Sequence, residues 1–159
     1  TRVIGSGPRA GEEFAVEVPT HVSALIQFES GASAQAVFSF QSHLVRVGFV
    51  EIAGTEGTLV FPDPNMFEGD LLVWTGDPKQ AETIATTKIA ERGTGVVDLA
   101  RAIRADVPER ASGEQAFHVL DVLVSIIEAA ESGEFVEVVS TVAAAEALPA
   151  DWDPTAATL

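Results

Sequence analysis

Alternating apolar and polar residues dominate the first two thirds of the chain and predict β-strands there. The alternation covers residues 22–28 and, after Ser30-Gly31, resumes over residues 32–40. Two such runs joined by a short glycine-containing turn predict a β-hairpin. Further strands are expected over residues 45–53, 58–61, 71–74 and 83–89.

Helical periodicity replaces this alternation in the last third of the chain. The spacing predicts one helix over residues 96–105 and a second that begins after Ser112 and ends near Ala130. Ser112 and Gln115 have capping-box spacing, and Gly133 suits the left-handed residue beyond a helix end. The stripes expected to face the core are Val96, Leu99, Ala100 and Ile103 on the first helix, and Ala116, Val119, Leu120, Leu123, Ile127 and Ala130 on the second.

Strands followed by helices are typical of an α+β fold. A last strand over residues 135–139 is expected to return to the sheet, ahead of an Ala-rich tail over residues 141–159. We therefore expect one α+β domain over residues 1–140, with an open, predominantly antiparallel mixed β-sheet and two main helices packed on one face.

The other face of that sheet is expected to meet a partner, because the strands carry small or apolar side chains on both faces. A second subunit in a homo-oligomer or another domain would cover it. The alternative is a mildly apolar face that stays in contact with water.

The net charge of the chain and its lack of cysteine limit the kinds of partner and site that we expect. Among 159 residues, 24 are acidic and 9 are basic, which gives a formal charge of −15. A chain this negative is repelled by phosphate backbones and anionic lipids, so no nucleic acid and no membrane is expected as a partner. The absence of cysteine excludes disulfides, thiolate metal sites and cysteine nucleophiles. It also fits a reducing compartment, and we expect a cytoplasmic protein.

The segment Gly5-Ser6-Gly7-Pro8-Arg9-Ala10 formally matches the dinucleotide fingerprint G-x-G-x-x-A. The fingerprint binds pyrophosphate where it opens a helix, whose free amides face the phosphates. Here an alternating run over residues 14–18 and then Pro19 follow, with no room for a helix. We interpret the motif as a turn and predict no cofactor site there.

The three histidines, His21, His43 and His118, lack the spacing of metal ligands, so no metal site is predicted. His118 lies on the second predicted helix, with Glu114 at i−4 and Asp121 at i+3. A carboxylate partner would orient His118 as a general base. The alternative, which we favour, is a structural histidine in a helix-face ion pair or hydrogen bond.

Four of the seven arginines lie between Arg92 and Arg110. Helical spacing predicts two surface ion pairs, Asp98 with Arg101 and Asp106 with Arg110. Arg92 differs because it precedes Gly93-Thr94-Gly95 at the start of a helix, where free amides can meet an anion or a sugar hydroxyl.

The segment over residues 61–69 contains two prolines and is predicted to be a rigid loop with a buried Phe67. Asp63 and Asn65 are expected to bond their own backbone.

Four motifs occur in a characteristic order. They are Gly54-Thr55-Glu56-Gly57-Thr58-Leu59, Pro62-Asp63-Pro64-Asn65-x-Phe67-x-Gly69, Arg92-Gly93-x-Gly95 and Ala116-x-His118-Val119-Leu120-Asp121-Val122. In this order they resemble the C-terminal domain of the Gfo/Idh/MocA oxidoreductases, the family of glucose–fructose oxidoreductase and the inositol dehydrogenases.

The resemblance implies the substrate-side and oligomerisation domain of an NAD(P)-dependent oxidoreductase acting on a sugar, a polyol or a related carbohydrate. An N-terminal Rossmann domain, expected upstream, would bind NAD or NADP, and the open sheet face would form a homodimer or a higher homo-oligomer. The implied substrate-binding residues are Arg92, Gly93, Gly95 and His118.

The family's catalytic motifs, Glu-Lys-Pro and Asp-x-x-x-His, are absent from this sequence. We therefore expect the chain by itself to be catalytically inactive, with no catalytic residue and no bound cofactor. Two alternatives stay open: a non-enzymatic α+β protein-interaction or dimerisation module, and a small complete enzyme that uses His118.

Overall fold

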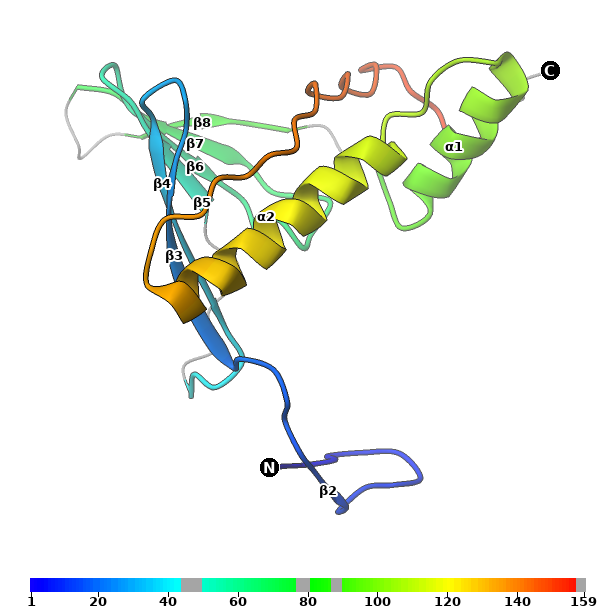
Figure 1. Ribbon diagram of the computed structural model, residues 1–159. Coiled ribbons are helices and arrows are strands. Elements are labelled where there is room, and N and C mark those ends of the chain that lie inside the picture. Colours follow the sequence, from blue (N-terminus) through cyan, green and yellow to red (C-terminus); the bar gives the residue numbers. More distant parts are fainter. Residues whose placement is uncertain (44–49, 77–80, 87–89, 157–159) are drawn as a thin grey trace. The chain divides into compact units, whose positions relative to one another are not determined.

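The computed structural model is an α+β architecture of small, open antiparallel sheets and two helices (Figure 1). It describes residues 1–43, 50–76, 81–86 and 90–156. The chain divides into two compact units, Thr1–Val45 with Glu128–Glu134, and Arg46–Ile127 with Phe135–Leu159. The predicted α+β class is confirmed, while the expected boundaries of a single domain over residues 1–140 stay a prediction.

The first unit begins with a two-stranded ribbon, β1 (Arg2–Val3) paired antiparallel with β2 (Glu13–Phe14). The glycine-rich segment joins these strands as a loop, closed by hydrogen bonds from the Gly11 amide to the Ile4 carbonyl and from the Ile4 amide to the Glu12 carbonyl. No helix follows the segment. The interpretation of the Gly5–Ala10 segment as a turn is therefore confirmed.

The predicted hairpin is present as β3 (His21–Gln27) and β4 (Ser33–Ser39), paired antiparallel. Its turn is closed by hydrogen bonds between Phe28 and Ala32 and between Gly31 and Phe28, with Gly31 at φ 87°. One face carries half-buried small and branched residues, and the other carries exposed residues that include Leu25 and Val37.

The second unit contains a four-stranded antiparallel sheet in the order β5 (Val50–Ala53), β6 (Thr58–Phe61), β7 (Leu71–Trp74) and β8 (Ala81–Ile84). The Gly54 amide donates to the Gly57 carbonyl and closes the β5–β6 turn. A side chain at Gly57 would place a Cβ 2.5 Å from the Trp74 carbonyl oxygen. Glycine at residue 57 therefore lets β7 lie close to this turn.

Helix α1 (Thr94–Ala105) begins after Gly93 and ends at Asp106, both in the left-handed region. Helix α2 (Gly113–Ser132) begins where the Gln115 amide donates to the Ser112 hydroxyl at 3.2 Å, and it ends before Gly133 at φ 72°. The predicted cap and the predicted glycine stop are thus both confirmed.

Two predictions about the sheet are wrong for the part of the chain that the structure describes. Every strand pair there is antiparallel, so the pairing is not mixed, and the hairpin and the four-stranded sheet belong to different units. Residues 135–139 form no strand, although their burial alternates. Ser140, which comes directly after this segment, bonds His118 and Asp121 of α2. The predicted strand residues 45–49 and 87–89 lie outside the described residues.

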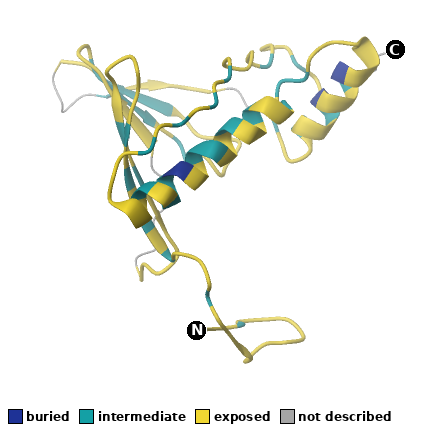
Figure 2. Ribbon diagram, in the orientation of Figure 1, coloured by how far each residue is buried: buried dark blue, intermediate teal, exposed yellow. Residues whose placement is uncertain are grey.

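The apolar stripes of both helices are exposed in this structure (Figure 2). On α1, Val96 is 72% and Ile103 is 71% exposed, whereas Asp98 and Ala102 are buried. On α2 the exposed side chains include Phe117 and Leu120, and Ser125 is buried. The less exposed side of each helix is therefore of mixed polarity, with Ala102 beside Asp98 on α1 and Val122 and Ile126 beside Ser125 on α2. Packing of the helices on one sheet face stays a prediction.

Candidate functional site

His118, on α2, is joined to Ser140 in the segment that returns after the helix. Its Nδ1 lies 2.8 Å from the Ser140 hydroxyl oxygen. Asp121, one turn further along α2, accepts a hydrogen bond from the Ser140 amide at 3.0 Å. All three residues are half-buried. The i, i+3 spacing on one helix places the imidazole and the carboxylate around the same serine.

The Ser140 hydroxyl is the largest cause that lowers the pKa of Asp121, followed by the Ser140 amide. In a hydrolytic triad the histidine lies between serine and carboxylate, whereas here the serine lies between the other two. This order favours a structural role for Ser140, which holds His118 and Asp121 together, over a role as a nucleophile.

Glu114 is not the partner of His118. The pKa of Glu114 is lowered by its own backbone amide first and then by the Ser112 hydroxyl, so its carboxylate belongs to the start of α2. Of the two carboxylates considered for His118, only Asp121 adjoins it, through Ser140. The prediction of a structural, hydrogen-bonded histidine agrees with these contacts.

The lowered pKa of Asp121 predicts a pH-dependent stability. Folding lowers the pKa of Asp121 below its ordinary value of 3.8. The carboxylate therefore stabilises the folded protein at pH values above 3.8, and this stabilisation is lost as the pH falls through the lower pKa of the folded state. We expect Asp121→Asn to reduce the free energy of unfolding at pH 7, with the difference shrinking below pH 3.8. Urea unfolding at several pH values measures it. Glu137→Gln, an exposed carboxylate in the same segment, should show no such trend, and a pH-independent loss for Asp121→Asn would contradict the assignment.

Arg92 lies exposed just before α1 and makes no hydrogen bond or ion pair with the described residues. Gly93 adopts φ 96°, and its carbonyl accepts the amides of Val96 and Val97. Gly95 lies in the first turn with open space where a Cβ would stand. Arg92, Gly93 and Gly95 thus lie together at the start of α1, with open space beside the two glycines. We call these three residues the arginine–glycine corner. No hydrogen bond links this corner to His118 within the described residues, and their substrate-binding role stays a prediction.

The two predicted surface ion pairs are wrong, because both arginines bond to distant residues. Arg110 pairs with Asp98 at 2.5 Å, and Asp98 is only 8% exposed. The Nε atom of Arg110 is buried without a hydrogen bond among the described residues. The ion pair between Arg110 and Asp98 connects the segment after α1 to the helix.

Arg101 binds the C-terminal tail. One of its terminal nitrogens donates to the carbonyls of Asp153, at 2.6 Å, and Ala156, at 3.0 Å. Its guanidinium lies 4.9 Å from the centre of the Trp152 ring. The Asp153 carboxylate accepts hydrogen bonds from the amide and the hydroxyl of Thr155. These bonds shape the turn to which Arg101 binds.

Removing the Arg101 side chain is expected to release this tail. The Arg101→Ala variant loses both hydrogen bonds and the stacking on Trp152, so the Trp152 fluorescence should shift to longer wavelength and the tail should be cleaved more rapidly by proteases. Arg104→Ala removes an exposed arginine from the same helix and should leave both unchanged. Unchanged fluorescence in Arg101→Ala would contradict the docking of the tail.

Among the described residues no group of three or more His, Asp or Glu side chains is arranged to hold a metal ion. No described helix is long and apolar enough to cross a bilayer. No family model, no curated protein and no solved structure matches the chain. The fold and the contacts define an α+β chain with a clamped histidine and an open arginine–glycine corner.

Proposed function

We propose that this chain is the C-terminal, substrate-side and oligomerisation domain of an NAD(P)-dependent oxidoreductase that acts on a sugar, a polyol or a related carbohydrate. The ordered sequence motifs carry the proposal. NAD or NADP would bind to a Rossmann domain of the longer protein, and this chain would contribute Arg92, Gly93, Gly95 and His118 to the substrate side.

The exposed apolar side chains support a position of this chain against another domain or another subunit. Large apolar side chains are exposed on the hairpin, on the four-stranded sheet and on both helices. Exposed apolar side chains stabilise a protein when a domain or a subunit covers them.

One face of the four-stranded sheet is the best candidate for the subunit interface. Cross-strand pairing places a set of apolar side chains together on it, namely Val50, Ile52, Leu59, Phe61, Leu71, Val73 and Ile84. Glu82 is the charged residue on this face of the described strands. We propose that a second copy of the chain covers this sheet face.

Titration calorimetry with NADH and with NADPH tests the proposal. We expect no tight binding to this chain, and micromolar binding to the longer protein that carries the preceding reading frame. Tight binding by this chain alone would contradict the assignment. A longer protein that binds neither nucleotide would instead favour a non-enzymatic dimerisation module, because the same exposed apolar faces would serve it.

A further inference from the structure

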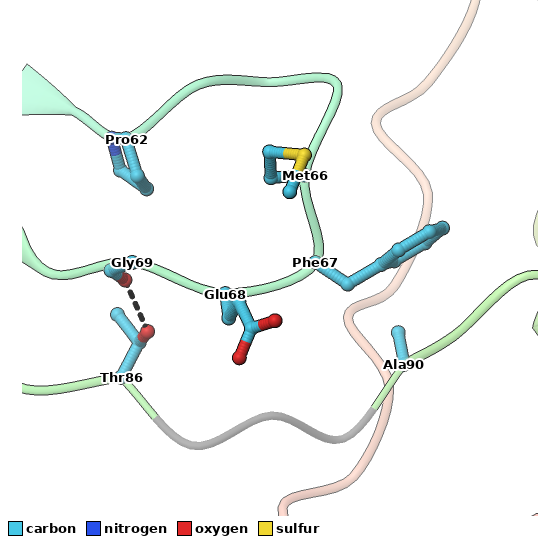
Figure 3. Close-up of a pocket in the computed structure, with 7 residues that line it drawn as sticks. All are labelled: Pro62, Met66, Phe67, Glu68, Gly69, Thr86 and Ala90. Atoms are coloured by element: carbon cyan, nitrogen blue, oxygen red, sulfur yellow. Dashed lines mark hydrogen bonds between the residues drawn. The ribbon is translucent and has the colours of Figure 1, made fainter.

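A hollow of about 340 Å³ lies beside the loop that follows β6 (Figure 3). Its described lining residues are Pro62, Met66, Phe67, Glu68, Gly69, Thr86 and Ala90. The volume falls within the range of small-molecule sites. Its described lining neither includes nor hydrogen-bonds any of the residues assigned to the proposed substrate side.

The shape of this loop is fixed by three local contacts. The Asp63 carboxylate accepts the Asn65 amide at 2.9 Å, as the sequence predicted, and the Thr86 hydroxyl donates to the Gly69 carbonyl at 2.5 Å. Gly69 adopts φ 130°, and a Cβ there would stand 2.5 Å from the Cβ of Pro62. These contacts hold the loop side of the hollow in one shape, which lowers the entropic cost of binding a ligand there.

The loop exposes two large apolar side chains beside the hollow. Phe67 was predicted to be buried but is 43% exposed, and Met66 is also exposed. In Figure 3 the Phe67 ring extends outward from the loop, on the side of the view where Ala90 lies, and Pro62 lies on the other side. Exposed apolar side chains around a preformed hollow offer surface that a ligand with an apolar body can cover.

Glu68 contributes the charge. It is the charged residue among the described lining residues, and its carboxylate has no hydrogen bond or ion pair within the described part of the chain. The chain as a whole carries a net charge of −15, which raises the local concentration of cations. A sugar would need several polar partners, whereas the described side chains offer the Glu68 carboxylate and a Thr86 hydroxyl that already donates to Gly69.

We propose that this hollow binds a small organic cation, an ammonium group attached to a compact apolar body. The ammonium pairs with the Glu68 carboxylate, and the apolar body lies against Phe67, Met66 and Pro62. The site is separate from the proposed oxidoreductase function and does not depend on it.

Titration of the ¹⁵N-labelled chain with benzylamine, followed by amide chemical shifts, tests the site. We expect shifts in the amides of residues 66, 67, 68, 69 and 86, with a dissociation constant on the order of 1 mM. Benzyl alcohol, which has the same apolar body without the charge, should bind about three- to fivefold more weakly, because an ion pair with an exposed carboxylate contributes up to about 1 kcal/mol. In Glu68→Gln the two ligands should bind within about twofold of each other.

Two further variants separate charge from shape. Phe67→Ala should weaken benzylamine and benzyl alcohol alike, by about tenfold. Glu56→Gln, an exposed carboxylate in the β5–β6 turn outside the hollow, should change neither. Equal affinity of the unmodified chain for amine and alcohol would overturn the proposal, as would a preference for the amine that survives Glu68→Gln or shifts confined to other parts of the chain. None of these outcomes bears on nucleotide binding by the longer protein.

Discussion

The Ile52→Glu variant is expected to weaken self-association of the chain about a thousandfold. Ile52 is 56% exposed on the edge strand β5 and lies opposite Leu59 on the proposed subunit face. Placing a charge at a buried interface position costs about 2 kcal/mol or more. A two-fold symmetric interface contains the substitution twice, so the total is about 4 kcal/mol, which corresponds to about three powers of ten in the dissociation constant.

Light scattering coupled to size exclusion, over a range of concentrations, measures this effect. Thr83→Glu is the matched control, because it adds the same charge to an exposed position on the opposite face of the same sheet. It should leave the association constant within about twofold. A monomeric unmodified chain at high concentration, or equal effects of the two substitutions, would refute the sheet face as the interface.

Asp98→Ala is expected to lower the free energy of unfolding by about 2–3 kcal/mol. Asp98 is buried, and its removal leaves the guanidinium of Arg110 without its partner while the buried Nε is already unbonded among the described residues. Breaking a buried pair costs 3–5 kcal/mol in general. We expect a smaller loss because the side chain of Arg110 is 33% exposed and water can reach it.

A double-mutant cycle with Arg110→Met distinguishes the ion pair from packing. The double variant should be less destabilised than the sum of the two single variants, since neither partner is then left buried and unpaired. Chemical denaturation measures all four proteins. Strictly additive losses would show that Asp98 and Arg110 contribute independently.

The sequence alone determined the local elements. The hairpin of β3 and β4, the glycine turns at Gly31 and Gly57, and both ends of α2 followed from alternation, helical spacing and capping residues. These features depend on neighbours in the chain, so a sequence pattern contains the information that specifies them. The turn at Gly5–Ala10 was recognised for the same reason, because the helix that a nucleotide site requires was missing from the adjacent residues.

Tertiary structure alone decided which residues meet. Arg110 bonds Asp98, Arg101 bonds the tail and His118 bonds Ser140, across separations that no helical spacing encodes. Residues 135–139 alternate as a strand would but form no strand, and Phe67 borders a hollow although the sequence predicted it to be buried. Both outcomes depend on the tertiary structure. Side chains of one chemical type can satisfy a hydrogen bond or cover an apolar surface with many partners of similar energy. The choice among such partners depends on the path of the whole chain in space.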